Sequence, residues 1–430
     1  MSQPPSRGAR GRLAAAALAL AALVRCTPST EAESAPPART AAHTTAHTTA
    51  PDSSRVAPHP AATLGAVTEL RVPFAGETVN PFIASDGADG FVVTWTDRKA
   101  STLNVAALRD GRWFQPRMVA RGKLLINHAD FASIVPGPHG AMFAQWVEQN
   151  GHGSVVRLAR SGDGGATWSA PVTPHPQVVS AFGFVSLAPS ADGAADVVWL
   201  DGRTLEGGEE GHGDMQLASA HIAADGKLTA ESLVDGRVCD CCQTAMAVTN
   251  SGPLVAYRDR SAGEIRDIAV VRRTASGWSK PAIVHADDWQ IPGCPVNGPQ
   301  LAANGDDVVI VWFTGARNTP RVNVAFSSNG GATWTPPTRV DGGQQTAGHA
   351  GVALLPDRSA VVTWIEGTHL MARRVGRDVS DPPINVAEVS SAHAAGFPRV
   401  AVSKENVAVA WNGEGAKPSI RLATIKLANR

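Results

Sequence analysis

Short apolar runs that end in an aromatic residue recur along most of the chain. Each run is about five residues long, is rich in Val and Ala, and is followed by polar residues. Near-continuous apolar runs of this length indicate strands that are covered on both faces. The seven copies end at Trp95, Trp146, Trp199, Tyr257, Trp312, Trp364 and Trp411.

The spacing of these runs predicts the fold class. Consecutive aromatics are 51, 53, 58, 55, 52 and 47 residues apart, and no helical periodicity lies between them. Repeats of this length with several strands each are typical of a β-propeller, in which every repeat forms one blade. We therefore expect an all-β propeller of seven four-stranded blades over residues 66–430. The alternative is six blades with one copy acting as an insertion.

The two ends of this region predict how the ring closes. The last repeat stops after its third strand, Ile420–Leu427, and the run Ala66–Pro73 has no repeat of its own. If this run supplies the missing outer strand of the last blade, two exposed sheet edges disappear. The expected device is therefore closure by an N-terminal strand.

Two octapeptides carry a specific turn signal. They are 161–168, Ser-Gly-Asp-Gly-Gly-Ala-Thr-Trp, and 327–334, Ser-Ser-Asn-Gly-Gly-Ala-Thr-Trp. The Asp or Asn can accept hydrogen bonds from its own turn, and the glycines accept positive φ. Both octapeptides resemble the Asp-box (BNR) repeat of the sialidase superfamily, and the chain resembles an exported bacterial member of it. The box itself is a structural turn and does not establish an activity.

The resemblance implies a set of candidate catalytic residues. Sialidases of this type hold the substrate carboxylate with arginines and attack with a tyrosine that a glutamate activates, while an aspartate serves as acid and base. Tyr257 is the only tyrosine in the chain, so it is the candidate nucleophile. Asp259 or Glu264 would activate it, and Arg258 and Arg260 would hold the substrate. Tyr257 also stands where six other repeats have Trp, so a packing role is the alternative.

Charged residues follow the aromatic run in several repeats. Because Arg offers a forked pair of donors, such residues around one mouth could bind a carboxylate or sugar hydroxyls. The alternative is a set of salt bridges that tie neighbouring blades together. The candidate substrate-binding residues are Asp97, Arg98, Asp201, Arg203 and Arg317.

Four cysteines fall in two consecutive inter-blade loops, Cys239, Cys241 and Cys242 in one and Cys294 in the next. In an exported protein they favour two disulfides, with Cys294 reaching the first loop. A thiolate site for copper or zinc is the alternative, and free thiols are the third. Histidines at matching inter-blade positions could form or join a transition-metal site, or each could bond its own turn. These histidines are His128, His349 and His393.

The N-terminal region predicts export. Three arginines precede the 12-residue apolar run Leu13–Val24, so residues 1–26 are expected to be a signal peptide. Cys26 resembles the lipidated cysteine of a bacterial lipoprotein, although Arg25 departs from that pattern. Residues 27–65 are rich in Ala, Thr and Pro and are predicted to be a disordered linker. The expected location is the periplasm, the outer membrane through a lipid anchor, or the extracellular space.

Composition limits the partners. The chain has 430 residues with 38 basic and 38 acidic side chains, so net charge gives no reason to expect nucleic acid or an anionic membrane surface. We expect a monomer whose partner is a glycan or another small acidic ligand. Two functions stay open: an exo-α-sialidase or related glycoside hydrolase, and a non-catalytic propeller with a Cys/His metal site or a disulfide-stapled ligand-binding mouth.

Overall fold

The computed structural model describes residues 62–205, 213–343, 345–404, 406–415 and 417–429. The predicted signal peptide, Cys26 and residues 27–61 of the predicted linker lie outside the described residues. No helix in the described part of the chain is long and apolar enough to cross a membrane.

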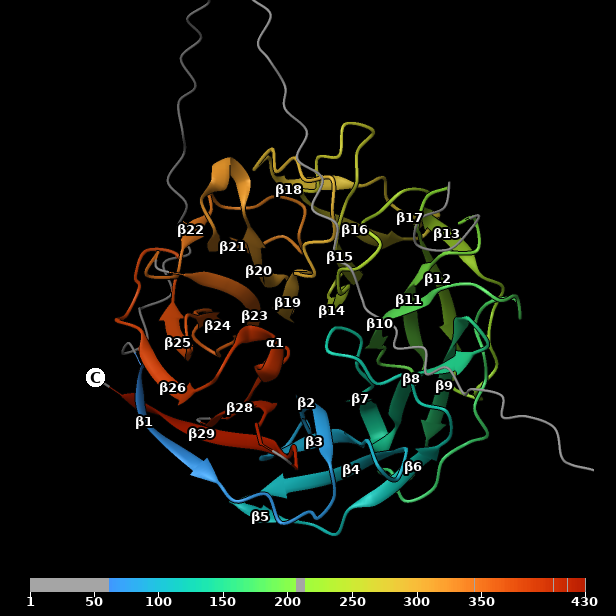
Figure 1. Cartoon of the computed structure of the whole chain (residues 1–430), viewed down its shortest axis with the longest axis horizontal. Coiled ribbons are helices and arrows are strands. Elements are labelled where there is room, and N and C mark those ends of the chain that lie inside the picture. Colours follow the sequence, from blue (N-terminus) through green and yellow to red (C-terminus); the bar gives the residue numbers. More distant parts are fainter. Residues whose placement is uncertain (1–61, 206–212, 344, 405, 416, 430) are drawn as a thin grey trace, which may run out of the picture. The chain divides into compact units, whose positions relative to one another are not determined.

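Seven sheets are arranged in a ring around a central axis, so the fold is the predicted seven-bladed β-propeller rather than the six-bladed alternative (Figure 1). Blades 1 to 7 are numbered from the sheet that begins with β2. Their strands are β2 (Thr78–Ser85), β3 (Gly90–Asp97), β4 (Thr102–Arg109), β5 (Arg112–Trp113) and β6 (Arg117–Arg121) in blade 1; β7 (Ser133–Pro136), β8 (Met142–Asn150) and β9 (Gly153–Ser161) in blade 2; β10 (Phe182–Pro189), β11 (Ala195–Asp201), β12 (Gln216–Ile222) and β13 (Ser232–Asp235) in blade 3; β14 (Ala245–Thr249), β15 (Gly252–Arg258), β16 (Ile268–Thr274), β17 (Gly277–Trp278) and β18 (Ala282–His285) in blade 4; β19 (Gln300–Asn304), β20 (Asp307–Thr314), β21 (Arg321–Ser327) and β22 (Thr338–Arg339) in blade 5; β23 (Thr346–Leu354), β24 (Ala360–Glu366), β25 (His369–Val375) and β26 (Ile384–Glu388) in blade 6; β27 (Arg399–Ser403), β28 (Asn406–Asn412), β29 (Ile420–Asn429) and β1 (Ala62–Leu70) in blade 7.

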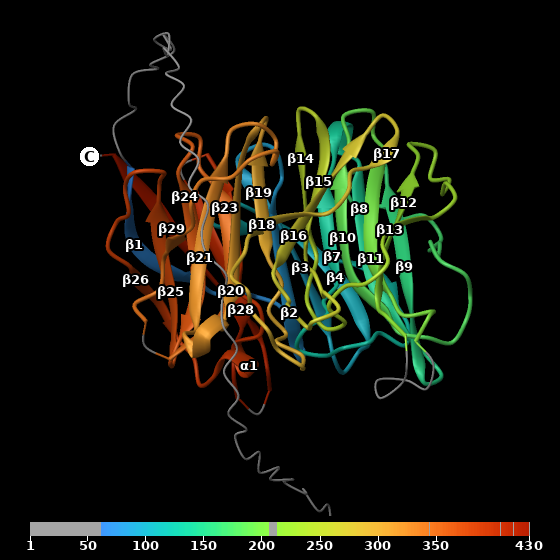
Figure 2. The same cartoon turned by 90° about the horizontal axis from the view of Figure 1, so that it is seen from above.

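Each blade is an antiparallel meander whose first strand lines the central channel (Figures 1 and 2). The fourth position is the most variable. It is split into β5 and β6 in blade 1 and into β17 and β18 in blade 4, and in blade 2 it is reduced to the isolated bridge between Leu158 and Val172. The variable strands are therefore on the outside of the ring, and the regular strands face the channel.

The ring closes as the sequence predicts. Strand β1 pairs antiparallel with β29, from Leu70 opposite Leu422 to Ala62 opposite Asn429. Figure 1 shows the first strand of the ring lying beside the last one. The closing strand begins at Ala62, four residues earlier than expected, and ends at Leu70.

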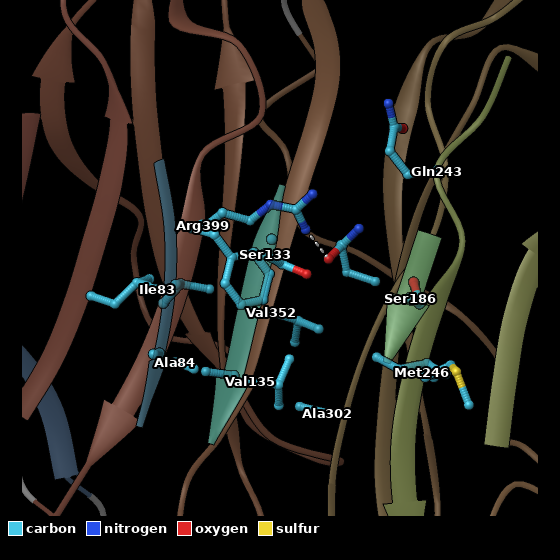
Figure 3. Close-up of a pocket in the computed structure, with 18 of the residues that line it drawn as sticks. Ile83, Ala84, Ser133, Val135, Ser186, Gln243, Met246, Ala302, Val352 and Arg399 are labelled. Atoms are coloured by element: carbon cyan, nitrogen blue, oxygen red, sulfur yellow. Dashed lines mark hydrogen bonds between the residues drawn. The ribbon is translucent and has the colours of Figure 1, made fainter. Parts of the chain in front are cut away.

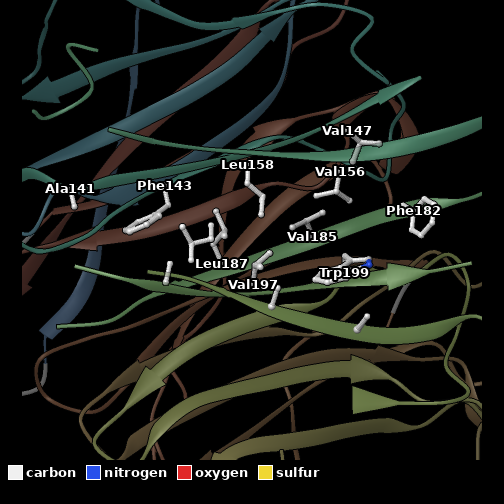
Figure 4. Packing of buried hydrophobic residues seen from close by; sticks show 14 residues of the cluster. Ala141, Phe143, Val147, Val156, Leu158, Phe182, Val185, Leu187, Val197 and Trp199 are labelled. Atoms are coloured by element: carbon white, nitrogen blue, oxygen red, sulfur yellow. The ribbon is translucent and has the colours of Figure 1, made fainter. Parts of the chain in front are cut away.

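The repeated apolar runs form the second strands, and their side chains pack between neighbouring blades. Between blades 2 and 3, Phe143 and Leu158 lie across from Leu187, Val197 and Trp199 (Figure 4). The seven aromatics that end these runs are all buried. Because both faces of each sheet are covered in this way, the runs are apolar at almost every position.

The two Asp-box octapeptides form the same turn. Asp163 accepts from the backbone N–H and the hydroxyl of Thr167 at 2.9 and 2.6 Å. In the second copy, Asn329 accepts from the Thr333 N–H at 3.0 Å and donates to its hydroxyl at 2.9 Å. The hydrogen bonds within the turn explain why these residues recur, without any ligand.

Removal of the closing strand should destabilise the whole ring. A chain that begins at Arg71 leaves β29 with an unpaired edge, and we expect its midpoint of thermal unfolding to fall by more than 10 °C, well beyond the few degrees of a typical point mutant. The matched control begins at Pro60 and keeps β1. Equal thermal midpoints for the two truncated chains, measured by circular dichroism, would refute closure by this strand.

Candidate functional site

The channel at the centre of the ring contains a cavity of about 320 Å³. All seven innermost strands contribute to its wall: β2, β7, β10, β14, β19, β23 and β27. Most lining side chains are small or aliphatic, such as Ala84, Val352 and Ala302 (Figure 3). Polar groups are few and gather toward the end where Gln243 and Arg399 lie. The cavity therefore combines apolar walls with a few polar groups, as small-molecule sites commonly do.

Arg399 is the main charged group of this cavity. It stands at the start of β27, is 7% exposed, and donates from Nη1 to the Gln300 side chain at 2.5 Å (Figure 3). Its guanidinium stacks on the ring of Phe131 at 3.9 Å, and its Nε has no hydrogen-bond partner. No carboxylate in the described part of the chain forms an ion pair with it. Burial lowers the pKa of Arg399 to about 9, so Arg399 stays charged at neutral pH.

Asp130 is the acidic group of the same wall. It is 6% exposed and accepts a hydrogen bond from the Phe184 N–H at 3.0 Å. Burial raises the pKa of Asp130 to about 7, against the smaller opposite effect of its backbone hydrogen bonds. The carboxyl therefore keeps a proton close to neutral pH and can act as a proton donor.

The cysteine loops lie beside the mouth of the channel. Cys242 precedes Gln243, whose side chain donates to the Ala129 carbonyl at 2.8 Å and accepts from the Gly298 N–H at 2.9 Å. Gln243 thus joins the Cys239–Cys242 loop to a neighbour across the channel and to the Cys294 loop. The Cys241 thiol is the largest cause of the lowered pKa of Cys294, so the two loops are neighbours, while the disulfide reach of Cys294 stays a prediction.

Three of the four thiols lie close together, and all four are unbonded. The Cys239 sulfur lies 3.2 Å from that of Cys242 and 3.9 Å from that of Cys241, and none of the four cysteines forms a disulfide. The pKa of Cys239 is lowered, first by hydrogen bonds from the Cys241 and Cys242 thiols and also by the charge of Arg258. Within the described residues, Cys239, Cys241 and Cys242 form the only group of three or more His, Cys, Asp or Glu side chains close enough to share an ion.

The predicted catalytic residues Arg260 and Glu264 belong to an ion-pair network beside these thiols. Glu264 accepts from Arg260 and Arg266 at 3.0 and 2.8 Å, and Arg237 lies 3.3 Å away. Burial acts to raise the pKa of Glu264, but the hydrogen bonds from Arg260 and Arg266 outweigh it and the pKa is lowered. Glu264 is therefore an ionised partner of three arginines, which does not suit a general base.

Arg258 is 2% exposed, and its hydrogen bonds go to backbone carbonyls. It donates to the carbonyls of Asn297, Arg266 and Phe313 at 2.6 to 3.0 Å, and it lies over the Trp289 ring at 4.8 Å. These bonds hold the Cys294 loop against blade 4. No ligand can reach its donors.

Tyr257 has the environment of a packing aromatic. It is 1% exposed in the core between blades 3 and 4, and its hydroxyl donates to Asp235 at 2.6 Å. Burial and the Asp235 carboxylate raise the pKa of Tyr257. Asp259 is half-buried, and burial raises its pKa too. Neither the access nor the acidity of Tyr257 favours a nucleophile.

The charged residues after the aromatic runs mostly satisfy the aromatics themselves. Trp199 donates from its indole nitrogen to Asp201 at 3.0 Å, and Asp201 in turn holds Arg203 at 2.5 Å. Trp146 donates to Glu148 in the same way, and Trp364 to Glu366. Asp201 and Arg203 therefore fit the salt-bridge alternative better than substrate binding.

The remaining predicted binding residues do not converge on the cavity. Asp97 accepts from the Ala100 N–H at 2.8 Å within its own turn, and Arg98 is exposed. Arg317 is exposed in a short turn at φ 58°. None of these three residues lines the cavity.

The histidines meet only in part. The rings of His128 and His393 lie 4.3 Å apart, and Figure 1 shows the helix that carries His393, α1 (Ala392–Ala395), near the ring axis. His349 is buried, stacks on Phe397, and bonds the Gly396 carbonyl through Nδ1 at 2.6 Å. Burial lowers the pKa of His349 to about 4. His349 thus bonds backbone, which was the alternative to metal binding.

Arg399, Gln300 and Asp130 were missed by sequence reasoning. Arg399 begins an inner strand, and in a propeller the inner strands form the channel wall. A charged residue at the start of a predicted inner strand was therefore the sequence feature that could have identified it. The sequence contains no such signal for Asp130, because the burial of Asp130 follows from the packing of β7 against β10.

No protein-family model matches the chain, and none of the curated proteins matches it in sequence. Among solved structures, a puromycin hydrolase mutant is 11% identical with a TM-score of 0.50, over 80% of this chain and 51% of that one. A mutant of NanB sialidase from Streptococcus pneumoniae is 10% identical, with a TM-score of 0.45 over 79% and 84%. The Hadza microbial sialidase Hz136 is 12% identical, with a TM-score of 0.43 over 76% and 73%. The likeness to these structures concerns the β-propeller fold alone.

Replacement of Tyr257 by Phe should reduce stability. The ring still fills its place, but Asp235 loses a hydrogen bond, so we expect the free energy of unfolding to fall by about 1–3 kcal/mol. Urea denaturation measures this change. An unchanged stability would contradict a structural role for the hydroxyl.

Asp130 should make stability pH-dependent. Its pKa is raised on folding, so its contribution is fully present below about pH 4 and is lost as pH rises through about 7. Asp130→Asn keeps an acceptor for Phe184 without the charge. We expect the stability of this variant relative to wild type to increase between pH 4 and 8, by at most about 4 kcal/mol. A pH-independent difference in urea denaturation would show that Asp130 is not buried as an acid.

Proposed function

We propose that this protein is an exported sialidase-like propeller that binds a small acidic ligand, of the size of one acidic sugar, in its central channel. The observation that carries the proposal is the Arg399 cation, buried in the cavity without a carboxylate partner. A buried charge of this kind is unfavourable unless an opposite charge compensates it.

The surroundings of Arg399 support a carboxylate ligand in particular. Gln300 fixes the orientation of the guanidinium through Nη1, and Arg399 is part of the cavity lining. A carboxylate can accept two parallel hydrogen bonds from a guanidinium, which gives both energy and orientation. Ser133, Ser186 and Thr244 also line the cavity. The Ser186 and Thr244 hydroxyls bond each other at 2.8 Å and Thr244 donates to the Phe184 carbonyl at 2.7 Å, so they offer a sugar acceptors rather than free donors. The export that the signal-like N-terminus predicts would bring the propeller into contact with extracytoplasmic glycans.

A second candidate function is hydrolysis of an acidic glycoside. The observation that favours it is Asp130, a carboxyl in the same wall that keeps its proton close to neutral pH. A general acid needs this protonation state in order to donate to the leaving oxygen. Tyr257 would have no part in such a reaction.

Binding of acidic sugars should depend on Arg399. Calorimetric titration with N-acetylneuraminic acid and D-glucuronic acid should show binding, and N-acetylglucosamine should not bind. Arg399→Gln removes a charged donor, so we expect affinity for the acid to fall about 10- to 100-fold. Arg317→Gln is the matched control, because Arg317 is exposed and outside the cavity.

Three outcomes would contradict the binding proposal: no binding of either acid, equal binding of the neutral sugar, or an equal loss for Arg317→Gln. Turnover of a fluorogenic sialoside decides the second function. Hydrolysis abolished by Asp130→Asn and retained by Tyr257→Phe would support it.

A further inference from the structure

The cluster of Cys239, Cys241 and Cys242 has sulfur separations that suit an ion better than a disulfide, and Cys294 lies on the neighbouring loop. A disulfide requires sulfurs about 2.05 Å apart. The Cys239 sulfur lies 3.2 and 3.9 Å from its two neighbours. Four thiolates at zinc bond lengths of about 2.3 Å place their sulfurs about 3.8 Å apart, which is within the same range.

The backbone holds the first loop independently of any ion. The Cys239 N–H donates to the Arg258 carbonyl at 3.0 Å, and Val238 forms an isolated bridge with Asp259. Gln243 fixes the other end of the loop through Ala129 and Gly298. The sulfurs of Cys239 and Cys242 are therefore aimed at one point by the fold.

The second loop brings Cys294 to the open side. Arg258 binds the Asn297 carbonyl, and the Arg266 N–H donates to the Trp289 carbonyl at 2.9 Å, so this loop is anchored on both sides of Cys294. Cys239 and Cys242 are buried, whereas Cys294 is exposed. An ion would enter from the Cys294 side and be enclosed by the other three residues.

Positive charge is already in place to balance a thiolate site. Arg266 has a side chain that is 4% exposed and donates from Nη1 to the Cys239 sulfur at 3.3 Å. Arg266 also pairs with Glu264 at 2.8 Å and Asp240 at 3.7 Å, whereas Arg258 has no carboxylate partner in the described part of the chain. Four thiolates around Zn²⁺, or three around Cu⁺, leave a net charge of about −2, which the uncompensated Arg258 offsets in part and Arg266 stabilises through its hydrogen bond to the Cys239 sulfur.

We propose that Cys239, Cys241 and Cys242 bind one thiophilic cation, Zn²⁺ or Cu⁺, with Cys294 as the outermost ligand and Arg266 as a charged hydrogen-bond donor to the Cys239 sulfur. Each ligating thiol gives its proton to solvent when the ion binds, so binding strengthens with pH. Sulfur ligands select these soft or borderline ions over Mg²⁺ and Ca²⁺, which require oxygen. The site is separate from the cavity of Arg399 and does not depend on acid binding there.

Metal content and thiol protection test the site directly. The full chain is purified without oxygen in a non-thiol reductant, stripped of metal, and titrated with Zn²⁺ alone and with Cu⁺ alone. We expect one ion per chain, four of the five thiols protected from alkylation until a chelator is added, and a rise in the thermal midpoint. Cys26→Ser removes the one cysteine outside the cluster and is the control that should bind normally.

A variant of Cys294 distinguishes the two ions, and a variant of Arg266 tests its hydrogen bond to the cluster. Cys294→Ser keeps the buried core of the cluster, so its fold should survive. If the ion is Zn²⁺, loss of the fourth thiolate should weaken binding at least about 100-fold; if it is Cu⁺, three thiolates suffice and the loss should stay below about 10-fold. Arg266→Gln should weaken either ion about 10- to 100-fold as loss of an outer partner.

Two results would overturn the proposal. One is folded, reduced protein that binds neither ion at one per chain. The other is protein recovered from the periplasm whose mass and resistance to alkylation show two disulfides among these four cysteines. If Arg399→Gln loses sugar binding but binds metal normally, the result bears only on the acid-binding proposal for the channel and not on the metal site.

Discussion

Each blade buries the polar atom of an aromatic side chain, and that atom needs a hydrogen-bond acceptor. Blades stack through large rings at the ends of their second strands, and an indole or phenol in such a position would be costly if its donor stayed unpaired. In five of the seven blades the acceptor is a carboxylate, for example Asp201 for Trp199, Asp287 for Trp312, and Asp235 for Tyr257. The carboxylates then pair with arginines, as Asp287 does with Arg321. The charged rim therefore follows from the apolar core.

This dependence explains which parts of the molecule could be predicted. The number of blades and the closing strand follow from spacing, because a blade must bury both faces wherever it stands in the ring. The charged residues after the aromatic runs could be identified in the sequence, but their role could not. The same sequence pattern occurs whether these residues bind a ligand or accept a hydrogen bond from a buried indole. Tyr257 shows the same ambiguity. Its position in the repeat predicted packing, whereas the family resemblance predicted catalysis, and its contacts are those of packing.

Residues outside the repeat pattern were harder to interpret. Cys294 could be placed near Cys241 because both loops enter consecutive blades on one face. Whether the thiols bond each other or hold an ion depends on separations of a few tenths of a nanometre, which no pattern contains. Asp130 and Arg399 depend on depth in the channel, and depth is set by all seven inner strands together.

Two of the four buried arginines differ in how their donors are satisfied. Arg258 and Arg399 are both nearly inaccessible and both lack a carboxylate partner in the described part of the chain. Arg258 nevertheless has acceptors for its donors, namely four hydrogen bonds to three carbonyls, and Trp289 covers its face. Arg399 has one hydrogen bond, to Gln300, a buried Nε without a partner, and a place in the lining of the cavity. The fold therefore satisfies one buried guanidinium fully and leaves the other with a single side-chain hydrogen bond, which is the difference on which the proposed acid site rests.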